Sequence, residues 1–103
     1  MHPAIAEQQQ NLGDLCRRFG VKRLDVFGSA ARAADFDPAA SDVDLLVEFD
    51  REDDLARFLN FKRALEDLLA RRIDLVDRKA VEASRNYIRR RHILGGAEPL
   101  YAG

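Results

Sequence analysis

The hydrophobic residues of this chain follow two spacings, one helical and one alternating. Near the start, apolar side chains share one helical face and predict an amphipathic helix over residues 4–19, which Gly20 ends. The members of that face are Ile5, Leu12, Leu15, Cys16 and Phe19. Residues 21–27 are expected to form a strand, with Leu24 and Val26 on one face.

The next segment combines a turn with a second alternating run. Ser29 can cap a short helix over about 29–34, and residues 35–41 are expected to form a loop because they include Pro38. Apolar and polar side chains then alternate up to residue 49, which predicts a strand with one buried face. The buried positions are Val43, Leu45, Val47 and Phe49.

The second half of the chain repeats the alternation of helix and strand. The acidic residues 50–54 are expected to form a turn, and an apolar stripe predicts a helix over about 55–70. Residues 72–76 predict a third strand, and residues 80–92 predict a last helix. The remaining residues are expected to form a polar tail that carries Leu100 and Tyr101.

These elements predict the class of fold. Strands and helices alternate, and no linker or internal repeat divides residues 1–103, so we expect a single domain. The predicted fold is α+β (α/β-like): a small mixed three-stranded sheet that is packed on one side by helices.

Composition narrows the class of function and the location. Charged residues make up 34% of the chain, yet its formal net charge is −1. This balance argues against binding to nucleic acid or to a membrane through overall charge. The single cysteine, Cys16, excludes an internal disulfide. No apolar run approaches the roughly 18 residues of a membrane span and no signal-peptide pattern is present, so we expect a cytoplasmic protein.

Two aspartates on the second predicted strand suggest a metal site. Asp42 and Asp44 are separated by one residue, so on a strand both side chains point to the same face, roughly 6–7 Å apart. Two bare carboxylates at that distance repel each other, and a divalent cation removes the conflict. The alternative is a pair of solvated carboxylates on an exposed face, although acidic residues are disfavoured within strands.

Asp74 adds a third carboxylate from a different predicted strand. If the two strands are neighbours, Asp42, Asp44 and Asp74 converge on one face, as two-metal phosphoryl chemistry requires. In such a site Asp74 could also help to accept a proton from an attacking hydroxyl group. The alternative is that Asp74 pairs with Arg72 or Arg78.

The turn after the first strand is a candidate phosphate site. Gly28 lets a phosphate approach the backbone closely, and the hydroxyl of Ser29 can donate a hydrogen bond to a phosphate oxygen. Arg32 lies about one helical turn later and could reach the same anion. Gly-Ser turns are common, so this feature gains its meaning from the three aspartates.

Together these segments resemble a known family. The order G-S, D-x-D and a later aspartate on an apolar strand is the signature of the polymerase-beta-like nucleotidyltransferases. The phrases V-F-G-S-A-A-R, S-D-V-D-L-L-V-E-F and R-I-D-L-V resemble the MNT (minimal nucleotidyltransferase) domains, similar to antitoxins that act with HEPN toxins. The chain departs from the family pattern at Ala33, where the family often has glycine. It also departs in the length of the segment between Ser29 and Asp42, which at 12 residues is slightly longer than in many relatives.

The resemblance implies an activity and roles for the candidate residues. Gly28 and Ser29 would hold the nucleotide phosphates, Asp42 and Asp44 would ligate two magnesium ions, and Asp74 would ligate the catalytic one. The reaction would transfer AMP from ATP to a hydroxyl group. In the antitoxin branch this is a tyrosine hydroxyl on a HEPN ribonuclease toxin, which the modification silences.

Two other functions stay open. The chain could neutralise a toxin by binding alone, with its acidic residues against a basic surface of the toxin. It could instead modify a small-molecule hydroxyl, although 103 residues leave little chain to build an acceptor pocket. The adenylyltransferase hypothesis instead expects a partner protein that presents the acceptor hydroxyl group.

The last predicted helix carries polar residues without a clear chemical role. Arg89, Arg90 and Arg91 fit a solvated helix face, or else a surface that meets an acidic partner or RNA. His92 lies far along the chain from the aspartates and is expected to be a surface or helix-end histidine. Tyr87 is expected to be a packing residue, as is Tyr101.

Overall fold

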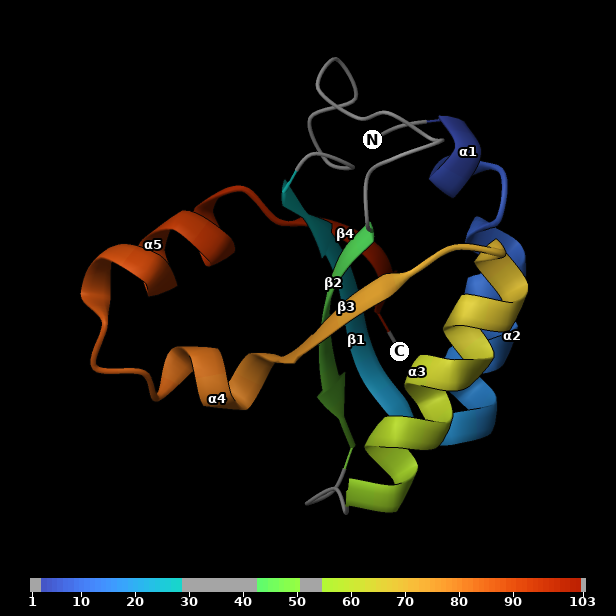
Figure 1. The fold of residues 1–103 in the computed structure, drawn as a ribbon, viewed down its shortest axis with the longest axis horizontal. Coiled ribbons are helices and arrows are strands. Elements are labelled where there is room, and N and C mark those ends of the chain that lie inside the picture. Colours follow the sequence, from blue (N-terminus) through green and yellow to red (C-terminus); the bar gives the residue numbers. More distant parts are fainter. Residues whose placement is uncertain (1–2, 29–42, 51–54, 103) are drawn as a thin grey trace.

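The computed structural model describes residues 3–28, 43–50 and 55–102. Within these residues one four-stranded mixed sheet lies at the centre of the molecule, in the order β3-β2-β1-β4 (Figure 1). β1 pairs antiparallel with β2 and β4, whereas β2 and β3 are parallel. The strands are β1 (Val21–Phe27), β2 (Val43–Phe49), β3 (Ile73–Asp77) and β4 (Glu98–Ala102).

The prediction of three strands was wrong, because the expected polar tail forms β4. This strand pairs with the free edge of β1, and Leu100 is buried in the main core. Pro99 cannot donate a ladder hydrogen bond, and it is tolerated because β4 is an edge strand. β4 has only five residues, which is too short for a clear alternating pattern. It also depends on pairing with β1, which the sequence of the segment does not indicate.

Two predicted helices are each divided. Residues 4–19 form α1 (Pro3–Ala6) and α2 (Gln9–Phe19), and the predicted helix over 80–92 is replaced by α4 (Arg78–Glu82) and α5 (Tyr87–Gly95). A new N-cap explains the second division, because the side chain of Asn86 accepts a hydrogen bond from the backbone N–H of Arg89.

The helix over 55–70 is confirmed as α3 (Leu55–Leu69). None of the described helices has the length and apolar character that crossing a membrane would need. The helix predicted for 29–34 and the loop predicted for 35–41 lie outside the described residues, as does most of the turn predicted for 50–54.

The main core lies between the sheet and the pair α2 and α3. Phe61 of α3 is fully buried, and its ring contacts those of Phe19 and Phe49 at centroid distances of 5.4 Å and 5.9 Å. Cys16 is buried in this core as expected, and its burial raises the pKa of the thiol to about 12. Most of the apolar side chains named in the sequence patterns meet here, including Ile5, Leu12, Leu45, Val47 and Ile73.

The opposite face of the sheet is covered in part by α4 and α5, so helices lie on both faces and not on one side as predicted (Figure 1). A small second core joins Leu46 of β2 to Val81 of α4 and Ile93 of α5. The polar positions of the strands share this face, because side chains alternate along a strand. This face of the sheet, towards α5, therefore carries the polar side chains that could take part in chemistry.

Candidate active site

Two of the three predicted aspartates lie side by side in the sheet. Asp44 of β2 and Asp74 of β3 are register partners in the parallel pair. Residues in register on neighbouring strands share a face, and such strands lie about 4.8 Å apart. Asp74 is exposed and Asp44 is half-buried, so solvent and ligands can reach this pair. The expected third member, Asp42, lies outside the described residues.

The alternation of the strands explains why the carboxylates share the open face. Val43 pairs with Ile73 and Leu45 pairs with Leu75, and all four side chains are buried in the main core. The aspartates between these positions must then point to the opposite face. The main core thereby fixes the direction of both carboxylates.

Arg78 does not neutralise Asp74. The guanidinium group of Arg78 lies 2.5 Å from Asp25 Oδ2 and 3.0 Å from Glu82 Oε1. No hydrogen bond or ion pair joins the side chain of Asp74 to another residue, Arg72 included, in the part of the chain that the structure describes. The alternative that Asp74 forms an ion pair with Arg72 or Arg78 was therefore wrong.

Gly28 lies against the carboxylate of Asp44. Phe27 is the register partner of Asp44 in the antiparallel pair and the last residue of β1, so Gly28 follows directly beside Asp44. Gly28 has a φ of +68°, and a Cβ atom there would lie 2.3 Å from Asp44 Oδ2. Only glycine fits this backbone and this close approach. The other two residues of the predicted phosphate site, Ser29 and Arg32, lie outside the described residues.

A pocket of about 860 Å³ connects this corner of the sheet with α5. Its sheet side includes Gly28 and Asp44, and its helix side includes Tyr87, Arg91 and His92. Among the residues that the structure describes, the pocket is lined by Phe27, Gly28, Asp44, Tyr87, Ile88, Arg91, His92, Ile93, Gly95 and Gly96. Its volume lies within the range of small-molecule sites, roughly 300–1,000 Å³.

The sequence analysis missed the part that α5 takes in this pocket. Arg91 was expected to lie on a solvated face or on a surface that meets an acidic partner or RNA, and His92 to be a surface or helix-end histidine. Tyr87 was expected to be a packing residue, but it is 57% exposed. Arg91 Nη1 donates a hydrogen bond of 3.2 Å to the hydroxyl of Tyr87. The i, i+4 spacing of these two residues was an available signal that they share a helical face. Their position on the same pocket as Asp44 could not be predicted from the sequence, because it depends on the path of the chain through β3 and α4.

Asp25 is a second feature that the sequence analysis missed. This carboxylate on β1 is fully buried, and it accepts hydrogen bonds from Arg23 Nε at 3.1 Å and Arg78 Nη1 at 2.5 Å. Its register partner is Leu46, so it shares the face that carries Asp44 and Phe27. Arg78 is the first residue of α4, and the ion pair therefore ties β1 to the start of the helical arm formed by α4 and α5.

Comparison with known proteins places the chain in a family. The model of the nucleotidyltransferase domain family matches residues 9–94. The chain belongs to this family. It is 39% identical over 70 residues to the protein adenylyltransferase MntA of Thermococcus cleftensis. The aligned residues make up 68% of this chain and 69% of that protein. It is 37% identical over 68 residues to a protein of Methanocaldococcus jannaschii that is provisionally named a protein adenylyltransferase, over 66% of this chain and 67% of the relative.

Solved structures share the fold of this nucleotidyltransferase. One provisionally described as a minimal nucleotidyltransferase is 33% identical, with a TM-score of 0.76 and 96% of each chain covered. A toxin–antitoxin complex with AMP-PNP gives a TM-score of 0.69 at 18% identity, over 92% of this chain and 73% of the other. The structure of a tri-AMPylated Shewanella oneidensis HEPN toxin in complex with MNT antitoxin gives a TM-score of 0.66 at 16% identity, over 96% of this chain and 73% of the other. The predicted family and fold class are confirmed, with four strands in the sheet.

The described residues suit a magnesium ion in chemistry, although they supply only part of a site. Asp44 and Asp74 present hard carboxylate oxygens on one face, and magnesium is commonly bound through one or two carboxylates together with substrate phosphates. The structure contains no group of three acidic, histidine or cysteine side chains that could hold a metal, counted over the described residues alone. The predicted ligand Asp42 is outside that count.

Replacing Gly28 with alanine is expected to damage this nucleotidyltransferase. The left-handed backbone costs an alanine about 1–2 kcal/mol, and the new methyl group would displace the Asp44 carboxylate. Because a shift of about 1 Å in a reacting group can cost about a hundredfold, the rate of nucleotidyl transfer should fall by about that factor. Rate measurements combined with urea unfolding separate the two effects.

Gly95→Ala is the matched control for this substitution. Gly95 also lines the pocket, but a Cβ atom there would meet nothing within 4 Å. Its variant should transfer nucleotide at close to the original rate. Equal rates for Gly28→Ala and the original chain would show that the close approach to Asp44 has no catalytic meaning.

Proposed function

We propose that this nucleotidyltransferase is a magnesium-dependent protein adenylyltransferase. It transfers AMP from ATP to a tyrosine hydroxyl of a HEPN ribonuclease toxin and so acts as the antitoxin of that toxin. The reaction requires ATP, and we propose the cytoplasm as its location. The observation that carries the proposal is the register pairing of Asp44 with Asp74 beside Gly28.

The proposed substrates draw on the relatives. MntA of Thermococcus cleftensis, named a protein adenylyltransferase, is 39% identical to this chain. A structure of the same fold holds a tri-AMPylated HEPN toxin together with an MNT antitoxin, and another holds AMP-PNP. These likenesses support AMP as the transferred group and a HEPN toxin as the acceptor of this chain.

The transfer exchanges one bond to phosphorus for another. The acceptor oxygen attacks the α-phosphorus of ATP, the bond from that phosphorus to the bridging oxygen breaks, and pyrophosphate leaves. The proton of the hydroxyl group passes to a base, for which we propose Asp74, because it is exposed on the shared face. Bound magnesium supplies a Lewis acid that offsets the charge on the phosphates.

The remaining candidate residues have binding roles in this proposal. Asp42, Asp44 and Asp74 would hold two magnesium ions. Gly28 and Ser29 bind the phosphates through the turn after β1, and Arg32 contributes charge. The close approach of Gly28 to Asp44 supports this assignment, since phosphate and metal would then meet at one place.

The test is a transfer assay with a purified HEPN-type partner, ATP labelled on the α-phosphate, and magnesium. We expect the label on a tyrosine of the partner, and we expect its ribonuclease activity to fall as the label accumulates. Chelation of the metal should stop both changes. Label from the γ-phosphate should not appear on the partner, because pyrophosphate leaves.

The same assay separates the alternatives. If the partner is silenced at equal stoichiometry without ATP or label, binding alone is the function and the enzymatic proposal is wrong. If label appears on a small hydroxyl compound and never on the protein, the acceptor class is wrong. Mapping the labelled residue by mass spectrometry decides whether it is a tyrosine.

A further inference from the structure

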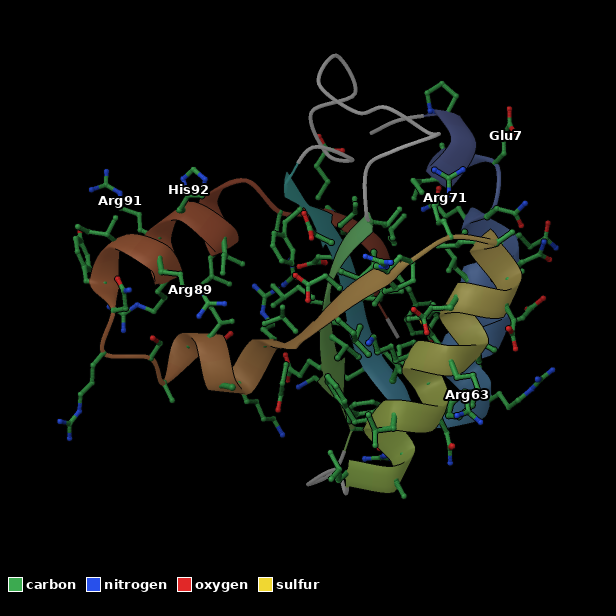
Figure 2. All side chains as sticks on the ribbon, in the orientation of Figure 1. Glu7, Arg63, Arg71, Arg89, Arg91 and His92 are labelled. Carbon is green, nitrogen blue, oxygen red and sulfur yellow. The ribbon has the colours of Figure 1, made fainter. Side chains whose placement is uncertain are left out.

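The cationic side of the pocket is formed by α5. Arg91 and His92 lie on one side of this helix, while Arg89 lies on the side towards α4 (Figure 2). Arg91 lines the same pocket as Gly28 and Asp44, whereas Arg89 lines a separate pocket of about 130 Å³ with Val76 and Val81. Two arginines separated by one residue therefore face different surroundings.

Nucleotide binding would bring several negative charges together in this pocket, so cations are needed to offset their repulsion. The reaction site contains carboxylates, and a nucleoside triphosphate brings several further negative charges into it. Magnesium offsets part of that charge. Arg91 is permanently charged, and its planar fork of N–H donors matches phosphate oxygens better than an ammonium group does.

The exposed side chain of Arg91 already has a hydrogen-bond partner on its own helix. Its Nη1 atom donates a hydrogen bond of 3.2 Å to the hydroxyl of Tyr87, one helical turn earlier and also on the pocket wall. Part of the rotamer entropy that an arginine loses on binding a ligand is then lost before binding. Tyr87 is 57% exposed, so its hydroxyl is not needed to satisfy a buried group.

We propose that Arg91, held by Tyr87, binds the β- and γ-phosphates of the nucleotide and so selects a triphosphate. The inference rests on the proposed function. The α-phosphate has to lie at the carboxylates where the reaction occurs, and Arg91 stands on the other wall of the same pocket. The part of the triphosphate that extends away from Asp44 therefore meets Arg91.

The test is equilibrium binding of ATP and AMP to the purified chain in magnesium, without any acceptor. Arg91→Ala should weaken ATP binding by about tenfold to a hundredfold, the range of charge-assisted hydrogen bonds, and leave AMP binding within about twofold. Tyr87→Phe should weaken ATP binding by about two- to tenfold. Arg89→Ala removes the same charge from the same helix and should leave both nucleotides unaffected.

Each result of this test bears on a different claim. If the original chain binds no ATP, the proposed function fails and the inference fails with it. If it binds ATP and Arg91→Ala equals Arg89→Ala, the inference alone is overturned. Equal losses for ATP and AMP in Arg91→Ala would place the arginine at the nucleoside and also overturn it. An unchanged ATP affinity in Arg91→Ala, together with a raised KM for the acceptor protein in the transfer assay described above, would assign Arg91 to the partner and overturn the inference.

Discussion

Asp44→Asn is expected to lower the rate of nucleotidyl transfer by at least about a hundredfold. The substitution keeps the size of the side chain but removes the charge beside Gly28 and in register with Asp74. Under the proposed function Asp44 is a metal ligand. Loss of such a ligand removes several kcal/mol of transition-state stabilisation, and about 1.36 kcal/mol corresponds to a factor of ten. Steady-state rates with a HEPN-type partner measure the effect.

Two further variants make this result specific. Asp74→Asn should cause a similar loss, and the double variant should lose much less than the product of the single losses, because the two carboxylates act as one unit. Asp67→Asn removes an exposed carboxylate from α3, which packs on the other face of the sheet. A loss in Asp67→Asn as large as that in Asp44→Asn would argue that net charge, and not this site, controls the rate.

The pairing of Asp44 with Asp74 follows from features that the sequence carries locally. The period of two in β2 and β3 buries Val43, Leu45 and Ile73, and this fixes which way the aspartates between them point. The sequence did not specify that the two strands are neighbours. The prediction depended on that pairing, which the structure supplies as a parallel register.

The errors of the prediction arise where long-range contacts decide the structure. β4 exists because β1 has an unpaired edge, and an isolated segment of that length has little reason to be extended. α4 and α5 are separated by the cap at Asn86, yet the continuous polar pattern on either side predicted one helix. The α5 wall of the pocket could not be placed without this break.

The burial of Asp25 also could not be predicted from the local sequence, because it depends on a long-range contact. An aspartate in an apolar strand such as V-K-R-L-D-V-F is usually expected to be exposed, because burial of an unpaired charge is costly. Its partner Arg78 lies 53 positions away in the chain. Sequence spacing gives no signal for an ion pair of that range.

Asp25→Asn is expected to lower the free energy of unfolding by about 3 kcal/mol. Breaking a buried ion pair costs about 3–5 kcal/mol because one charge is left without its partner. The lower end applies here, since the side chains of Arg23 and Arg78 are 42% and 15% exposed and water can reach them. Urea unfolding measures the loss, and alkylation of the buried thiol of Cys16 reports the same transition independently.

A surface ion pair provides the control for Asp25. Asp14 pairs with Arg17 on α2, where the two side chains are 59% and 60% exposed, so Asp14→Asn should cost no more than about 1 kcal/mol. Adding Arg78→Met to Asp25→Asn should restore part of the stability, because the unpaired charge is then removed as well. If Asp25→Asn and Asp14→Asn cost the same, the buried pair does not hold the α4 and α5 arm against β1. The pocket wall would then have to be positioned by the contacts of Leu46, Val81 and Ile93 alone.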